Sequence, residues 1–119
     1  MSQWYLVKLE LGQTLEYPNG SPGRAFLLRL PLEADGSVDE AMRAAAPREA
    51  FVRRFWQNEP DISGTVLPSA SGWIFAFPNG AAHLRYYLDN LQIRPGAQTV
   101  LTDSHGARQP FRVVSVRQE

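Results

Sequence analysis

Turn-forming residues divide this sequence into short segments. Clusters of Pro, Asn, Asp, Ser and Gly occur at residues 16–23 (EYPNGSPG), 68–72 (PSASG), 78–80 (PNG) and 103–106 (DSHG). Pro presets the backbone dihedral of a turn, and Gly and Asn tolerate the positive φ that tight turns require. Over much of the chain these signals recur about every 8 to 12 residues, which is typical of a small β-barrel or sandwich.

The segments between the turns alternate apolar and polar residues, as half-buried strands do. In residues 4–11, Tyr5, Val7 and Leu9 lie on one side, and Lys8 and Glu10 lie on the other. The last segment, residues 111–117, has apolar residues on both faces, which is typical of a covered strand or of one that carries a bulge. Period-two alternation predicts about eight short strands, near residues 4–11, 24–30, 50–57, 65–67, 73–77, 83–89, 98–101 and 111–117.

One segment changes to helical spacing. Ser37 followed by Glu40 is a capping-box pattern, and Pro47 prevents the helix from continuing. Between them, apolar residues recur at helical spacing: Val38, Ala41, Met42 and Ala45. We therefore expect a mostly β fold, namely a small antiparallel, partly open β-barrel with one short helix near residues 38–46. The alternative is an α+β sandwich, in which residues 83–91 form a second helix.

The chain length of 119 residues fits a single domain spanning residues 1–119. At this size roughly two-thirds of the surface of the unfolded chain can be buried, so the core needs no metal or disulfide to hold it together. Of the expected core residues, Leu28 is the sharpest test of the strand register. The alternation predicts a core of Tyr5, Val7, Leu9, Phe26, Leu28, Leu30, Met42, Phe55, Ile74, Val100, Val113 and Val116.

Charge balance and cysteine content exclude several classes of function. The chain has 12 basic and 12 acidic residues, which argues against bulk attraction to nucleic acid or to an anionic membrane. Lys8 is the only lysine, and the arginines that replace lysine elsewhere are scattered, as a coding bias would leave them. The absence of cysteine excludes thiol catalysis, thiolate metal sites and disulfide frameworks.

The first eleven residues, MSQWYLVKLEL, lack the basic run, the apolar stretch and the cleavage site of a signal peptide. No stretch of apolar residues is long enough to span a bilayer. We therefore expect a soluble cytoplasmic protein without a membrane partner.

The sequence contains no catalytic motif that is more specific than ordinary turn chemistry. His83 and His105 are the two histidines, and their spacing matches no metal-binding pattern. Asp103 beside His105 is better explained by a turn than by a metal site. The carboxylates of Glu59 and Asp61 fit solvated loop residues, and no phosphate-binding glycine loop or nucleophile elbow occurs. We predict no catalytic residues, no metal and no cofactor.

Arginines and aromatic residues alternate in two of the expected strands. Single-stranded nucleic acid binds to sheets on which aromatic rings stack against bases and arginines hold phosphates. The same aromatic residues are also needed for a core, and this second interpretation is favoured because the net charge is zero. The candidate binding surface consists of Arg53, Arg54, Arg85, Tyr86 and Tyr87.

These observations predict a small cytoplasmic binding or interaction module without catalytic activity. Its partner is an unidentified protein, peptide or small ligand. Two alternatives stay open, namely a single-stranded nucleic-acid binder and a small-molecule enzyme whose motif is not recognisable. Peptide binding could use strand addition at an open sheet edge or an exposed patch containing Trp4 and Trp73.

Overall fold

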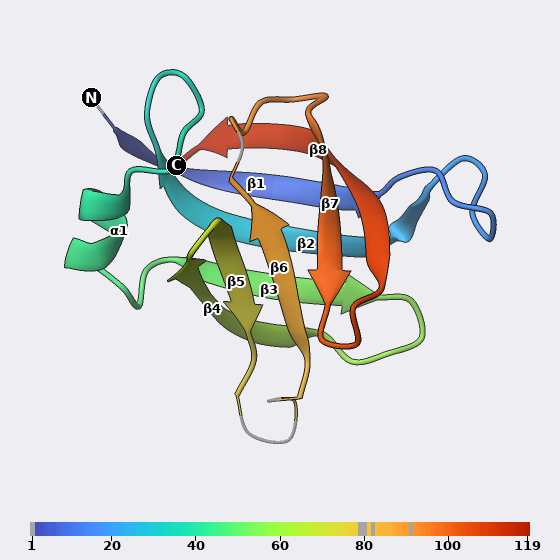
Figure 1. The fold of residues 1–119 in the computed structure, drawn as a ribbon. Helices are drawn as coiled ribbons and strands as arrows, with labels where there is room; N and C mark the ends of the chain where they lie inside the picture. Colours follow the sequence, from blue (N-terminus) through green and yellow to red (C-terminus); the bar gives the residue numbers. More distant parts are fainter. Residues whose placement is uncertain (1, 79–80, 82, 91) are drawn as a thin grey trace.

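The computed structural model describes residues 2–78, 81, 83–90 and 92–119 of the chain. Its strands follow one another in chain order around a closed antiparallel β-barrel (Figure 1). The expectation of a mostly β barrel with one short helix is confirmed. The strands are β1 (Gln3–Leu11), β2 (Ser21–Leu32), β3 (Phe51–Trp56), β4 (Ile62–Ser69), β5 (Gly72–Ala76), β6 (Arg85–Asp89), β7 (Gln98–Asp103) and β8 (Arg108–Gln118).

The barrel is closed rather than partly open, because β1 pairs with both β2 and β8. Val7 lies opposite Leu28 on one side and opposite Val116 on the other. The β1–β8 register shifts between Lys8 and Leu9, which lie opposite Ser115 and Val113 and so leave Val114 as the extra residue of a bulge. A bulge increases local twist and bends a strand, which helps a sheet to close. Of the two explanations offered for residues 111–117, a covered strand or a bulge, the bulge is therefore present, and it lies where the barrel closes.

The helix α1 (Glu40–Ala45) is shorter than predicted and has a different cap. Asp39, not Ser37, is the N-cap, and its Oδ1 accepts a hydrogen bond of 3.0 Å from the backbone N–H of Met42. Ser37 instead donates to Asp35. The helix buries Arg43, whose guanidinium lies 5.9 Å from the ring centroid of Trp73. Met42 is only partly buried, so the predicted apolar face of the helix is wrong.

The core confirms the predicted inward face of β1, β2 and the middle of β8. Val7, Phe26, Leu28 and Leu30 are fully buried. Leu9 and Val113 are almost fully buried. Tyr5 and Val116 are partly buried and pack against this core.

Three strands face the other way from the prediction. Phe55, Ile74 and Val100 are only partly buried. A shift of one residue exchanges the two faces of a strand, and alternation alone does not say which face is buried. The residues buried in their place are Val52 and Trp56 in β3, Trp73 and Phe75 in β5, and Leu101 in β7.

An aromatic cluster fills the inside of the barrel around Phe26. Its ring centroid lies 5.3 Å from those of Trp56 and Phe75, 5.0 Å from that of Tyr86 and 5.4 Å from that of Phe111. An eight-stranded barrel is just wide enough for side chains to fill it. At this level the interior is a packed core.

The alternative of a second helix over residues 83–91 is wrong where the structure describes that segment, because Arg85–Asp89 form the strand β6, as the main prediction of a strand near residues 83–89 expects. Leu91, and Asn79 and Gly80 of the predicted turn at 78–80, lie outside the described residues. The part of the chain that the structure describes contains no helix long and apolar enough to cross a membrane.

Candidate functional site

The five residues of the predicted binding surface lie on opposite faces of the barrel. Along β3 and β6 the side chains alternate, so Arg54 and Tyr86 are buried, whereas Arg53, Arg85 and Tyr87 are exposed. Nucleic-acid binding by this set required its members to share one face. The structure does not bring all five together.

Arg54 and Tyr86 meet inside the barrel. The Nε of Arg54 donates to the hydroxyl of Tyr86 at 3.1 Å, and its Nη1 lies 3.1 Å from the Glu59 carboxylate. The guanidinium also lies 4.1 Å from the ring centroid of Trp56. A buried charge is tolerated when it is paired and hydrogen-bonded, and Arg54 has both kinds of partner. These contacts give Arg54 and Tyr86 a structural role.

The exposed members are separated along the outer face. Arg53 lies opposite Ser63 of β4 and donates to its hydroxyl at 3.2 Å. Arg85 lies on β6 opposite Ala76 of β5. Two strands, β4 and β5, therefore stand between the two arginines. At the usual strand spacing, β3 and β6 are about 14 Å apart across the sheet.

The two routes predicted for peptide binding are not available either. Among the described strands, every strand of the closed barrel has a strand on each side, so strand addition finds no open edge there. Trp73 is only 7% exposed and lies beneath Arg43. Trp4 is partly buried, with the guanidinium of Arg29 4.4 Å from its ring centroid. The prediction of an exposed patch containing Trp4 and Trp73 is therefore wrong.

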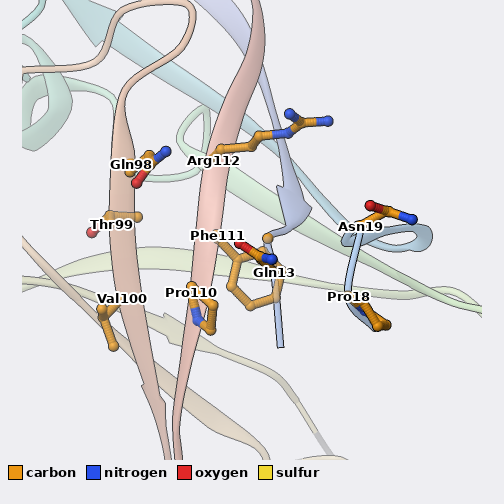
Figure 2. A pocket seen from close by; sticks show the side chains of 10 residues that line it. Gln13, Pro18, Asn19, Gln98, Thr99, Val100, Pro110, Phe111 and Arg112 are labelled. Carbon is orange, nitrogen blue, oxygen red and sulfur yellow. The ribbon is translucent and has the colours of Figure 1, made fainter. Parts of the chain in front are cut away.

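A groove of about 600 Å³ lies on the outside of the barrel, between the β1–β2 loop and the strands β7 and β8 (Figure 2). Figure 2 shows the β7 residues on one side, Pro18 and Asn19 of the loop on the other, and the β8 residues between them. This volume is within the range of small-ligand sites. The groove is lined by Gly12, Gln13, Pro18, Asn19, Gln98, Thr99, Val100, Pro110, Phe111 and Arg112.

Turn chemistry holds the loop that forms one wall of the groove. The backbone N–H groups of Thr14 and Gly20 both donate to the carbonyl of Tyr17 at 2.9 Å. Gly20 has a φ of +74°, and a Cβ there would lie 2.5 Å from the carbonyl oxygen of Leu11. The N–H of Gly12 donates to the carbonyl oxygen of Pro110 at 2.8 Å, and this hydrogen bond fixes the base of the loop against β8. The wall is therefore preformed.

The strand register sorts the groove into a polar part and an apolar part. Gln98 of β7 lies directly opposite Arg112 of β8, and Val100 lies opposite Pro110. Both pairs are on the outer face, because the alternate positions Leu101 and Phe111 are buried. The groove therefore combines an arginine and an amide at one position with an apolar pair two residues away.

The charge of Arg112 is available to a ligand. Arg112 is exposed and forms none of the ion pairs found among the described residues. Glu10 is opposite it on β1, but the Glu10 carboxylate lies 3.4 Å from the amine of Lys8. A guanidinium binds a carboxylate through two parallel hydrogen bonds, with a geometry that lysine does not offer.

The residues considered for metal binding have turn roles where the structure describes them. The carboxylate of Asp103 accepts hydrogen bonds of 2.9 Å from the backbone N–H groups of His105 and Ala107. Gly106 completes this turn with a φ of +83°. Within residues 2–78, 81, 83–90 and 92–119, no group of three His, Asp or Glu side chains is placed to hold a metal ion.

The groove residues Gln13, Asn19, Gln98 and Arg112 are absent from the sequence-based prediction. The sequence indicates the turn at residues 16–23, and it also indicates the turn at residues 103–106 with a strand on either side. A β7–β8 register with Gln98 opposite Arg112 places these two side chains on one face. The β1–β2 loop lies beside them only because β1 pairs with β8.

No protein-family model, curated protein or solved structure matches this chain.

Proposed function

We propose that this protein is a non-catalytic binding module that holds an extended peptide segment, through a carboxylate, in the groove between the β1–β2 loop and the outer face of β7 and β8. The observation that carries the proposal is the pairing of Gln98 with Arg112 inside a groove of about 600 Å³. Arg112 would bind the carboxylate, and Gln98 would donate to or accept from the same end of the ligand.

The rest of the lining suits a peptide. The amide side chains of Gln13 and Asn19 lie on the loop side and offer both donors and acceptors, as peptide groups require. Val100, Pro110 and Pro18 supply apolar surface for a side chain. Ligand sites usually combine apolar walls with a few polar groups that fix orientation.

The nucleic-acid alternative receives less support than the groove. Of its five residues only Arg53, Arg85 and Tyr87 are exposed, and two strands separate the arginines. Phosphate contacts would make affinity fall steeply with salt, so titration with a single-stranded oligonucleotide at two salt concentrations tests this alternative.

We also propose a cytoplasmic location, because the chain has none of the disulfides that small secreted domains use. Cell fractionation tests this location.

A titration with paired short peptides tests the groove. One peptide of each pair ends in a free carboxylate and the other in an amide. We expect the carboxylate form to bind at least tenfold more tightly, and Arg112→Gln to remove that difference. Arg108→Gln is the matched control, because Arg108 is exposed on the same strand but does not line the groove. Equal affinity of the two peptide forms for the unaltered protein would contradict the proposal.

A further inference from the structure

A row of large apolar side chains crosses the outer face of β4, β5 and β6, which lie side by side in Figure 1. Leu67 lies opposite Ile74, and Ile74 lies opposite Tyr87. Leu67 is 37% exposed and Tyr87 is 40% exposed, whereas most large apolar side chains that the structure describes are covered. Large contiguous patches of exposed apolar surface mark interaction sites, so this row is a candidate for one.

Smaller residues lie on both sides of this apolar row, which stands above them as a ridge. Thr65 and Ala76 lie opposite one another on one side, and Ser69 and Gly72 do so on the other. Gly72 is required by close packing, since a Cβ there would lie 2.1 Å from the carbonyl oxygen of Leu88.

On β6 the ridge is flanked by opposite charges. Arg85 and Asp89 are each two residues from Tyr87, so all three side chains share the outer face and all three are exposed. Neither Arg85 nor Asp89 forms one of the ion pairs found among the described residues. The order along the strand is therefore positive, aromatic, negative.

We propose that this face packs against the same face of a second copy of the chain, about a two-fold axis that runs along the apolar row. Such an axis places Leu67, Ile74 and Tyr87 against their own counterparts. It also reverses the direction of β6, so Arg85 of each copy faces Asp89 of the other. A two-fold interface requires this kind of self-complementarity, in which each patch is its own partner.

The spacing of packed sheets agrees with these contacts. Two sheets packed face to face lie about 10 Å apart, and an arginine and an aspartate side chain together span such a gap. A partner of one charge, such as nucleic acid, would leave either Arg85 or Asp89 facing a like charge. The alternation of sign across Tyr87 therefore favours a second copy.

A hollow beside the ridge has a counterpart under the same symmetry. It measures about 450 Å³, and Ser63, Thr65, Leu67 and Ala76 are among the residues that line it. The two-fold axis brings the β4–β5 hairpin of the second copy, with its small residues Ser69 to Gly72, over this hollow. The peptide groove is built from the β1–β2 loop, β7 and β8, so the dimer leaves it open.

Sedimentation velocity tests the dimer through a charge exchange. The protein is examined at concentrations from about 10 µM to about 1 mM, a range that suits a small interface. The variants are Arg85→Asp, Asp89→Arg and the double exchange of both. Arg117→Asp is the matched control, because Arg117 is an exposed arginine on β8 outside the patch.

We expect the unaltered protein and the Arg117→Asp control to dimerise with increasing concentration. Each single exchange should raise the dissociation constant at least tenfold, because it sets like charges opposite one another at two places. The double exchange should restore dimerisation to within about threefold, since opposite charges face each other again. A protein that stays monomeric at the highest concentration would overturn the proposal. A double exchange no better than the single ones would overturn it as well.

Discussion

The guanidinium of Arg54 and the hydroxyl of Tyr86 are joined by a hydrogen bond of 3.1 Å across the inside of the barrel. Their sequence neighbours Arg53 and Tyr87 are exposed on the outside. The pair links β3 to β6, which β4 and β5 separate in the sheet. It therefore ties two non-adjacent strands of the barrel wall together.

Substitutions of the adjacent Tyr86 and Tyr87 should differ in their effect on stability, because Tyr86 is buried and Tyr87 is exposed. Tyr86→Phe leaves a buried donor of Arg54 without its acceptor, and we expect a loss of about 1 to 3 kcal/mol in the free energy of unfolding, measured with urea. Tyr87→Phe, the control, should change stability by less than about 0.5 kcal/mol, because Tyr87 is exposed. Equal effects of the two substitutions would contradict the assignment of faces.

Leu28 tests the core of β2. It is fully buried and lies opposite Val7 and Val52. Leu28→Ala should cost about 2 to 5 kcal/mol, through lost transfer free energy and the cavity that remains. The neighbouring Leu27 is only partly buried on the other face, so Leu27→Ala should cost clearly less. A loss below about 0.5 kcal/mol for Leu28→Ala in chemical denaturation would show that the register of β2 is wrong.

Much of the barrel can be predicted from the sequence, but its faces cannot. In β3, Phe51, Arg53 and Phe55 alternate with Val52, Arg54 and Trp56, so each face offers two apolar residues and one arginine. Only the pairing with β2, in which Val52 lies opposite the buried Leu28, settles which set is inside. This is why the prediction placed Phe55 in the core and Arg54 on the surface.

Closure explains why the groove was not predicted. Gln13 and Arg112 are far apart in the sequence, and they come together because β1 pairs with β8. The alternation within one strand carries no information about which strands pair, so it does not show that the first strand pairs with the last. The turn residues were predictable because Pro, Asn and Gly have local conformational preferences.

Alanine substitutions at two glycines with positive φ distinguish the energetic cost of backbone strain from that of steric conflict. Gly106→Ala introduces strain at a φ of +83°, but its Cβ meets no atom of the described residues within 4 Å, and it should cost about 1 to 2 kcal/mol. Gly20→Ala adds a contact of 2.5 Å with the Leu11 carbonyl, so it should cost more and should also weaken binding in the groove. Thermal unfolding and peptide titration of both variants check this. A Gly20→Ala protein that binds peptide as tightly as the unaltered chain would contradict the role of the loop.

Acid should weaken the ion pair within α1 between Glu40 and Arg43. Two hydrogen bonds of 2.8 Å from Arg43 lower the pKa of Glu40 below its usual value of 4.5. A carboxyl group whose pKa is lower in the folded chain adds stability above its unfolded pKa, and this stability is lost as the pH falls through the folded pKa.

We therefore expect the urea midpoint to fall once the pH drops below about 4.5, and to fall less steeply in Glu40→Gln. Glu16→Gln, in the exposed β1–β2 loop, is the control and should follow the unaltered protein. If Glu40→Gln and the unaltered protein lose stability in parallel between about pH 5 and pH 3, the ion pair contributes nothing measurable.

Nuclear magnetic resonance mapping of a bound peptide tests the central proposal most directly. Backbone amide shifts are followed while a short peptide with a free terminal carboxylate is added to the protein. The groove predicts saturable shifts confined to residues 12–20, 98–100 and 110–112, and their loss in Arg112→Gln but not in Arg108→Gln. Saturable shifts that cluster on another face of the barrel, or that persist in Arg112→Gln, would contradict the account.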